Sequence, residues 1–302
     1  MNNTNRPLIL LIVNRLCGST TKPAKNTGHK GPECIEGVME KVAVAKDEFA
    51  FDSVEAFEDK DEWKDAIAVK DIVPLFDAYV VTNANTEATN YSTGKFTYET
   101  APAVKIRTFE AYLGFCSHAA LKSYANSVYT RIFEFNNDGS IVGVNTDNGG
   151  VKGQLLSKLG VGIRQASVAD KPATTVVTLT YADYNELEDN ACVIKPGWTH
   201  TDIPGIFDVE LELISATATS IKFKAYSDCG SDLVTNLVAA NVVVKNAAGV
   251  TQTTTFVAAD ANGVYTINGT AFATGYTVSI NGVVIQAEIM YEGVEPLVVT
   301  IT

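Results

Sequence analysis

The 302-residue sequence is poor in histidine, and it lacks the short motifs that mark the common catalytic and nucleotide-binding sites. Three histidines, His29, His118 and His200, lie far apart in the chain. The patterns G-x-G-x-x-G, G-x-x-x-x-G-K-[ST], H-E-x-x-H and G-x-S-x-G do not occur. No convergent set of catalytic side chains is present, so we expect a protein that is not an enzyme and that uses no cofactor or metal.

Cysteine is scarce as well. Five residues lie at wide, irregular spacings: Cys17, Cys34, Cys116, Cys192 and Cys229. No C-x-x-C pair occurs, which argues against a zinc site, and an odd count argues against a complete disulfide framework. We therefore expect five free thiols and a reduced compartment.

Long apolar runs are also missing, because none approaches the roughly 20 residues that a helix needs to cross a bilayer. The short apolar run at residues 7–13 is followed by Asn14-Arg15-Leu16 rather than by the small residues that signal processing requires. We expect a buried first strand at 7–13 rather than an export leader, and no membrane partner.

Positive charge is in deficit. The chain has 23 Lys and Arg against 35 Asp and Glu, which gives a net charge of −12. A surface that grips phosphates needs clustered Lys and Arg, so this balance argues against nucleic-acid binding. Solubility is the simplest explanation of the acidity. The balance also suits a surface past which nucleic acid slides without adhesion.

What the sequence does contain is enough apolar residues, 46%, for a sizeable core, at a length typical of about two domains. We expect a mainly β protein whose first domain, residues 1–195, is an α+β antiparallel sheet or barrel with one central helix. That helix is predicted from one apolar stripe at helical spacing. The stripe consists of Phe109, Tyr112, Leu113, Cys116, Ala120 and Tyr124.

Strands with alternating side chains are expected to follow the helix. They are residues 129–135, which end in the turn 136–139, then 141–146, 155–165 and 175–181. In the third strand Leu155, Leu159, Val161 and Ile163 are expected on one face. We expect this strand to leave an unpaired sheet edge.

The flanking segments are predicted from composition and spacing. Residues 18–32 are expected to form a long loop and 35–44 a strand, while 52–70 is predicted to be helical in two short pieces. Residues 80–108 indicate strands and loops with a turn at Ser92-Thr93-Gly94, and 184–189 one helical turn.

Two Pro-Gly dipeptides place a linker at residues 196–205. About eight short strands with turns between them, including the hairpin pair Asn281-Gly282, are then expected in residues 206–302. That number and spacing of strands are typical of an immunoglobulin-like β-sandwich, although the paired cysteines of antibody domains are absent.

Candidate site residues each have a simpler structural explanation. Cys116 and His118 could form a nucleophile pair, but close neighbours on a helix do not face each other. Residues 260–263 and 136–139 resemble the start of calcium loops, yet they lack the bidentate Glu and fit hairpin turns. The formal glycosylation sequons at Asn90 and Asn268 carry weight only in a secreted protein. A carboxylate cluster, most simply a solvated helix face, consists of Glu55, Glu58, Asp59, Asp61, Glu62 and Asp65.

The order of elements resembles the tail tube (major tail) proteins of long-tailed bacteriophages. The resemblance is carried by a β-rich first domain with a helix, by the strand and turn of residues 131–139 and the long strands after them, and by the appended immunoglobulin-like domain. It covers most of the chain but includes no diagnostic motif.

The resemblance implies a homo-oligomer of six copies per ring, with the sheets joined around a lumen and the rings stacked into a tube. Long loops such as 18–32 would reach the next ring, and the other partners would be further virion proteins. DNA would pass an acidic lumen without specific binding. The implied location is the virion tail, after synthesis in the cytoplasm of the bacterial host.

Two alternatives remain open at the level of sequence. One is a capsid or collar decoration protein whose immunoglobulin-like domain stands out from the shell. The other is an exported bacterial surface adhesin, which the N-terminal sequence does not favour.

Overall fold

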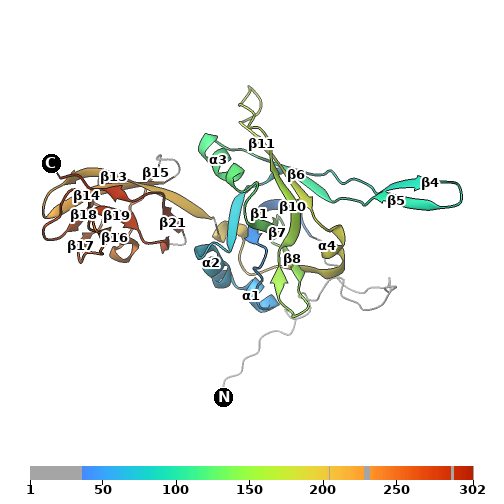
Figure 1. The fold of residues 1–302 in the computed structure, drawn as a ribbon, viewed down its shortest axis with the longest axis horizontal. Coiled ribbons are helices and arrows are strands. Elements are labelled where there is room, and N and C mark those ends of the chain that lie inside the picture. Colours follow the sequence, from blue (N-terminus) through green and yellow to red (C-terminus); the bar gives the residue numbers. More distant parts are fainter. Residues whose placement is uncertain (1–35, 204, 228–231, 287–288, 302) are drawn as a thin grey trace, which may run out of the picture. The chain divides into compact units, whose positions relative to one another are not determined.

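A computed structural model describes residues 36–203, 205–227, 232–286 and 289–301, and in these residues the protein is mainly β, as expected (Figure 1). The strand expected at 7–13, the loop expected at 18–32 and His29 lie outside the described residues. The chain divides into two compact units, Met1–Thr201 and Asp202–Thr302.

Short elements dominate the described part of the first unit. In chain order they are β1 (Met39–Lys46), α1 (Val54–Glu58), α2 (Lys60–Ala68), β2 (Ile72–Asp77), β3 (Tyr79–Asn83), β4 (Thr89–Ser92), β5 (Thr97–Ala101), β6 (Ile106–Ala111), α3 (Phe115–Ser123), β7 (Tyr129–Asn136), β8 (Ile141–Asn145), β9 (Val151–Lys152), β10 (Gln154–Val161), β11 (Thr175–Tyr181), α4 (Tyr184–Asn190) and β12 (Ala191–Ile194).

One antiparallel sheet organises this unit. Its strand order is β12-β8-β7-β10-β11-β6-β3, with β1 pairing to both β7 and β2, and β9 to β8. Strand β10 pairs with β7 only at Gln154 and Leu155, and with β11 from Leu156 to Val161, so in the described residues most of β10 has a partner strand on one side only, in keeping with the edge expected at residues 155–165. The two ends of the strand order are β3 and β12.

The side-chain alternation predicted for β11 is confirmed, because Val177, Leu179 and Tyr181 are buried. In β10 the prediction fails by one residue. A register shift between Leu156 and Lys158 places Leu156 and Leu159 in the core, whereas Leu155 is only partly buried. A bulge inserts an extra residue, so the side chains that point inward are at even-numbered positions before the bulge and at odd-numbered positions after it.

The inner face of the sheet, defined here as the face that carries the main core of the unit, is apolar. Its buried residues come from β1, β2, β6, β7, β10 and β11, and they include Val42, Val44, Leu75, Phe109, Ile132, Leu156, Leu159, Val177 and Leu179. This burial removes apolar surface from water, which is the main driving force for folding the unit.

The opposite face of β7 packs on α1 and α2, the two helical pieces expected in residues 52–70. The side chains of Ser53 and Asp59 cap the two helix starts. Trp63 lies 5.1 Å from Phe133 and 5.6 Å from Phe57, ring centre to ring centre. These rings form a second buried cluster that attaches the helices to the sheet.

The expected central helix is shorter than predicted. Phe109 belongs to β6, which pairs with β11 from Ile106 to Ala111, and α3 begins only at Phe115 after Gly114. Strand pairing thus overrides the helical spacing of the apolar residues. Within α3 only Leu121 is buried. The other three α-helices of the described residues, α1, α2 and α4, correspond to the helical segments expected at 52–70 and 184–189.

The segment 196–205, expected as a linker, is partly packed on the first unit. The Trp198 indole nitrogen donates a hydrogen bond to the Glu58 carbonyl oxygen at 2.8 Å, and its ring lies 5.9 Å from Trp63. A short 3₁₀ helix, η2 (His200–Asp202), follows.

The second unit contains short strands as well. They are β13 (Ile206–Ala216), β14 (Ser220–Ser227), β15 (Asp232–Leu233), β16 (Val242–Lys245), β17 (Thr255–Val257), β18 (Tyr265–Asn268), β19 (Thr277–Ile280), β20 (Val283–Gln286), β21 (Ile289–Gly293) and β22 (Leu297–Val298), with the 3₁₀ helix η3 (Ala239–Asn241).

These strands form two sheets. One has the order β17-β18-β14-β13-β21-β20 with β15 beside β14, and the other the order β16-β19-β22. Phe223 and Tyr265 of the first sheet share one core with Val244 and Val278 of the second. Asn281 and Gly282 join β19 to β20, but these strands lie in different sheets and do not pair, so the predicted hairpin is wrong. Gly282 nevertheless has a positive φ of 65°.

Candidate functional site

Among the described residues of the first unit, the most exposed element is a hairpin of β4 and β5, which Figure 1 shows extending away from the sheet. We call residues 84–105 the arm. Its two strands pair only with each other among the described residues, and every residue in them is exposed. The turn predicted at Ser92-Thr93-Gly94 is confirmed, with Gly94 at a φ of 83° and Thr93 bonded to the Phe96 carbonyl.

One face of the arm is aromatic. Tyr91 lies directly opposite Tyr98, and the Phe96 ring lies 6.4 Å from that of Tyr98. Tyr91, Phe96 and Tyr98 are 62%, 63% and 57% exposed. An isolated two-stranded hairpin is marginal in water, and clustered exposed apolar side chains mark interaction sites. The arm therefore has the properties of a contact surface.

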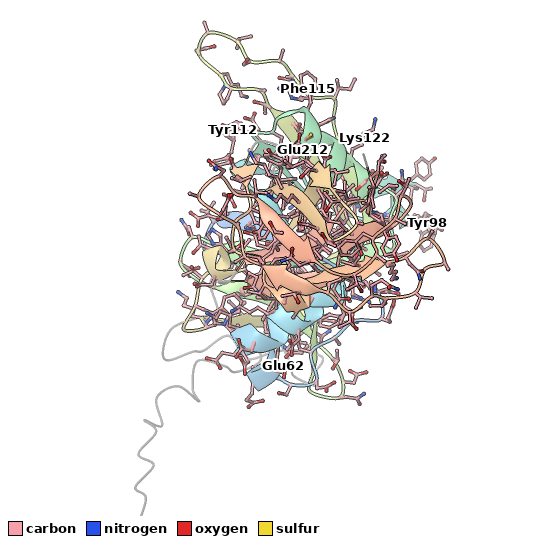
Figure 2. All side chains as sticks on the ribbon, turned by 90° about the vertical axis from the view of Figure 1, so that its left-hand side faces the viewer. Glu62, Tyr98, Tyr112, Phe115, Lys122 and Glu212 are labelled. Carbon is pink, nitrogen blue, oxygen red and sulfur yellow. The ribbon has the colours of Figure 1, made fainter. Side chains whose placement is uncertain are left out.

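A second exposed aromatic patch lies where β3 ends the strand order. The Tyr79 ring stacks on Tyr112 at 4.6 Å, and the Arg164 guanidinium lies 4.1 Å from the centre of the Phe115 ring. Phe115 is 80% exposed. Figure 2 labels Tyr98 on the arm, and Tyr112 and Phe115 in this patch.

Strand β3 itself is irregular. Its register against β6 shifts between Tyr79 and Thr82, and between them Val80 has a φ of +49°. A β-branched residue in this conformation is strained. A bulge of this kind limits strand addition at an open edge, because it breaks the row of backbone donors and acceptors.

A polar layer occupies one end of the inner face. Arg107, Glu134, Gln154 and Tyr181 each lie two positions from a core residue on the same strand, so all four point inward. Glu134 is 1% exposed; it forms an ion pair with Arg107 and accepts a hydrogen bond from the Tyr181 hydroxyl.

Lys105, at the base of the arm, completes the layer. Its Nζ donates to Oε1 of Gln154 at 3.2 Å and lies 4.5 Å from the centre of the Tyr181 ring. Burial lowers the pKa of Lys105, opposed in part by the charge of Glu134. Burial and the neighbouring Glu134 raise the pKa of Tyr181 well above its usual value.

The candidate pair on α3 is not assembled. His118 Nδ1 lies 2.9 Å from the Thr175 hydroxyl, so its ring is engaged with β11. Cys116 is disulfide-bonded, which makes the expectation of five free thiols wrong. Cys192 is a free, buried thiol whose pKa burial raises to about 12, and a thiol of that pKa is a poor nucleophile.

The other candidate residues have structural roles. The carboxylate cluster lies on α1 and α2, where Asp59 caps a helix and Glu62, labelled in Figure 2, faces solvent. Asp260 accepts hydrogen bonds from the backbone of Asn262 and Val264, which stabilises a hairpin turn. Asn90, in one sequon, lies in the arm, and Asn268, in the other, ends β18.

The described residues contain neither a candidate metal site nor a membrane-spanning helix. No group of three or more His, Cys, Asp or Glu side chains there is placed to hold a metal ion. None of the helices in that part of the chain is long and apolar enough to span a membrane.

The arm and the polar layer were both missed at the level of sequence. Tyr91, Phe96 and Tyr98 do flank the predicted turn, and their spacing places them on one face of a hairpin. The polar layer has a weaker signal in the sequence, namely polar residues at inward positions of strands whose inward residues are otherwise apolar.

No protein-family model matches the sequence, and no curated protein matches it either.

Proposed function

We propose that the chain is a virion structural protein of a long-tailed bacteriophage, whose first unit assembles into stacked rings that form the tail tube. The observation that supports this most is the arm, a hairpin with an aromatic face that has no partner among the described residues of its own chain. Burial of about 100 Å² of apolar surface is worth about 2.5 kcal/mol, so covering three aromatic side chains favours association strongly.

We propose that the contact is heterologous, with the arm of one copy on a different surface of the next copy. A heterologous contact between identical chains closes into a ring or continues as a filament. Stacked rings are the arrangement that a tube requires, and we propose that the arm together with the sheet end at β12 provides the contacts. We propose six copies per ring, with other virion proteins at the ends of the tube.

The outward face of the sheet suits a surface past which DNA moves. One row across four strands consists of small neutral residues, Thr82, Thr108, Thr178 and Gly160. With a net charge of −12 per chain, an assembly would repel phosphates rather than bind them. We propose that DNA passes without specific binding, and that the chain is not an enzyme.

The second unit is proposed to be an immunoglobulin-like β-sandwich that decorates the tube. Support comes from its two sheets and the single core that they share. Strands β13 and β21 pair in parallel, and the remaining strand pairs of this unit are antiparallel among the described residues.

An exported surface adhesin is the second candidate, because the disulfide at Cys116 favours an oxidising environment. Virion surfaces also retain disulfides, so this observation does not displace the tube proposal. A capsid or collar decoration protein would share the second unit but would have no use for the arm as a contact between copies.

Negative-stain electron microscopy of the purified full chain tests the proposal. We expect rings or tubes, and we expect them to be lost when Tyr91, Phe96 and Tyr98 are together replaced by Ser. The matched control is Val128→Ser, an exposed apolar residue outside the arm, which should leave assembly intact. Monomers at every concentration, or tubes that survive the triple replacement, would contradict the proposal.

A further inference from the structure

The contact between Lys105 and Gln154 brings an amine and a carboxamide together across the sheet. Lys105 directly precedes β6, and Gln154 is the first residue of β10, 49 positions later. The Lys105 Nζ lies 3.2 Å from Gln154 Oε1, so the carbonyl carbon of the amide is within about one further bond length of the amine.

The Gln154 carboxamide is held in one orientation. Its oxygen Oε1 accepts a hydrogen bond from Lys105. Its nitrogen Nε2 therefore points to the other side, where it is buried with no hydrogen-bond partner. The residue is 2% exposed. An unpaired buried amide nitrogen costs free energy that is recovered when the nitrogen leaves.

The surroundings of Lys105 favour the neutral amine. Burial lowers its pKa, and the ring of Tyr181 lies 4.5 Å from Nζ. The charged groups that act on it are Glu134, Arg107, Glu36 and Glu188. Glu134 holds Tyr181 in place by accepting a hydrogen bond from its hydroxyl group. Glu134 is therefore a positioning residue for the contact between Lys105 and Gln154.

We propose that Lys105 and Gln154 form an intramolecular isopeptide bond. The Nζ–Cδ bond forms, the Cδ–Nε2 bond breaks, and the leaving nitrogen takes the proton that the amine gives up. The neutral amine of Lys105 and the carboxamide of Gln154 thus become one amide and one ammonia molecule. No oxidant, metal or further reactant is needed, because the acyl oxidation level is unchanged.

The product would tie the base of the arm to β10, in the middle of the sheet. Force applied to the arm would then pass into the sheet through a covalent bond in addition to the hydrogen bonds of β6. This inference does not depend on which particle the chain builds.

Intact-mass spectrometry of the purified full chain, denatured and reduced, tests the bond. The expected mass is lower than that of the sequence by one ammonia, and proteolysis should release a branched peptide that joins the segments around Lys105 and Gln154. Lys105→Arg should abolish both results. Lys158→Arg, at an exposed lysine of β10, is the matched control and should retain both.

Two outcomes would overturn the proposal. Linear peptides that contain unmodified Lys105 and unmodified Gln154 in full yield from the native chain exclude the bond, whether or not the Lys105→Arg variant folds. An ammonia loss that persists in Lys105→Arg, with no branched peptide, would instead be a succinimide at an Asn-Gly pair such as Asn281-Gly282.

Discussion

At the scale of single residues, the first unit depends on a few large aromatic side chains. Trp63 is fully buried, donates its indole N–H to the Phe57 carbonyl at 2.8 Å, and contacts rings on both β7 and α1. Both tryptophans of the chain lie in this cluster, because Trp198 packs on Trp63. Tryptophan fluorescence therefore reports on this cluster.

Replacing Trp63 by Ala should lower the free energy of unfolding of the first unit by about 3–5 kcal/mol, since it leaves a large cavity. Chemical denaturation, followed by the fluorescence of the remaining Trp198, measures the change. Val69→Ala, at an exposed residue that ends α2, should change stability by no more than about 0.5 kcal/mol. Similar losses in both variants would contradict the packing described for α2.

Asp138 gives the fold a dependence on acid. Partial burial alone would raise the pKa of this carboxyl group, but hydrogen bonds from Lys195 and Ser140 outweigh it and lower the pKa to about 2. The Lys195 Nζ lies 2.6 Å from Asp138 Oδ2. A depressed folded-state pKa stabilises the fold above the unfolded value of about 3.9.

That stabilisation should be complete near neutral pH and should disappear as the pH falls from about 4 to about 2. We expect Asp138→Asn to destabilise the chain at pH 6 and to have almost no effect at pH 2, as measured by urea denaturation. A double-mutant cycle with Lys195→Met isolates the pair. An effect of Asp138→Asn that is equal at both pH values would show that the charge is not responsible.

At the scale of elements, the arm is the least supported part of the described first unit. Its strands have no other neighbours among the described residues, whereas β11 is paired on both sides. Segments with few buried contacts open easily and are cut first by proteases.

Before assembly, mild proteolysis should cleave first within residues 89–101, and assembly should protect that segment. Mass spectrometry of the fragments, with the Tyr91, Phe96 and Tyr98 triple Ser variant as control, measures this. The variant should be cleaved at the same rate under assembling and non-assembling conditions. If the arm of the native chain gains no protection in assembled material, it is not the contact between copies.

At the scale of the whole molecule, charge opposes association, because each chain carries −12. Salt screens repulsion between exposed charges, and the Debye length falls to about 3 Å at 1 M. Assembly that is driven by apolar burial at the arm should then become more favourable as salt rises.

Light scattering between low salt and 1 M salt should therefore show a lower critical concentration at high salt. The first unit, residues 1–201, should follow the full chain, while the second unit, residues 202–302, should stay monomeric. Assembly by residues 202–302 alone, with the first unit monomeric at every salt concentration, would favour an adhesin or decoration protein.

Patterns in the sequence were sufficient to predict those elements whose structure depends on residues close together in the chain. The alternation of Val177, Leu179 and Tyr181 predicted β11, and the helical pieces at 52–70 and the Gly94 turn follow from short-range chemistry. The mainly β class was predictable for the same reason, because a period of two along the chain is a local property.

Strand pairing, register and the polar layer were decided only by the tertiary structure, because they depend on residues far apart in the chain. Pairing with β11 turned Phe109 from a predicted helix residue into a strand residue, and a bulge exchanged Leu155 for Leu156 in the core. The meeting of Lys105, Glu134, Gln154 and Tyr181 joins four strands. No local spacing encodes that meeting, because strand order and register bring these side chains together.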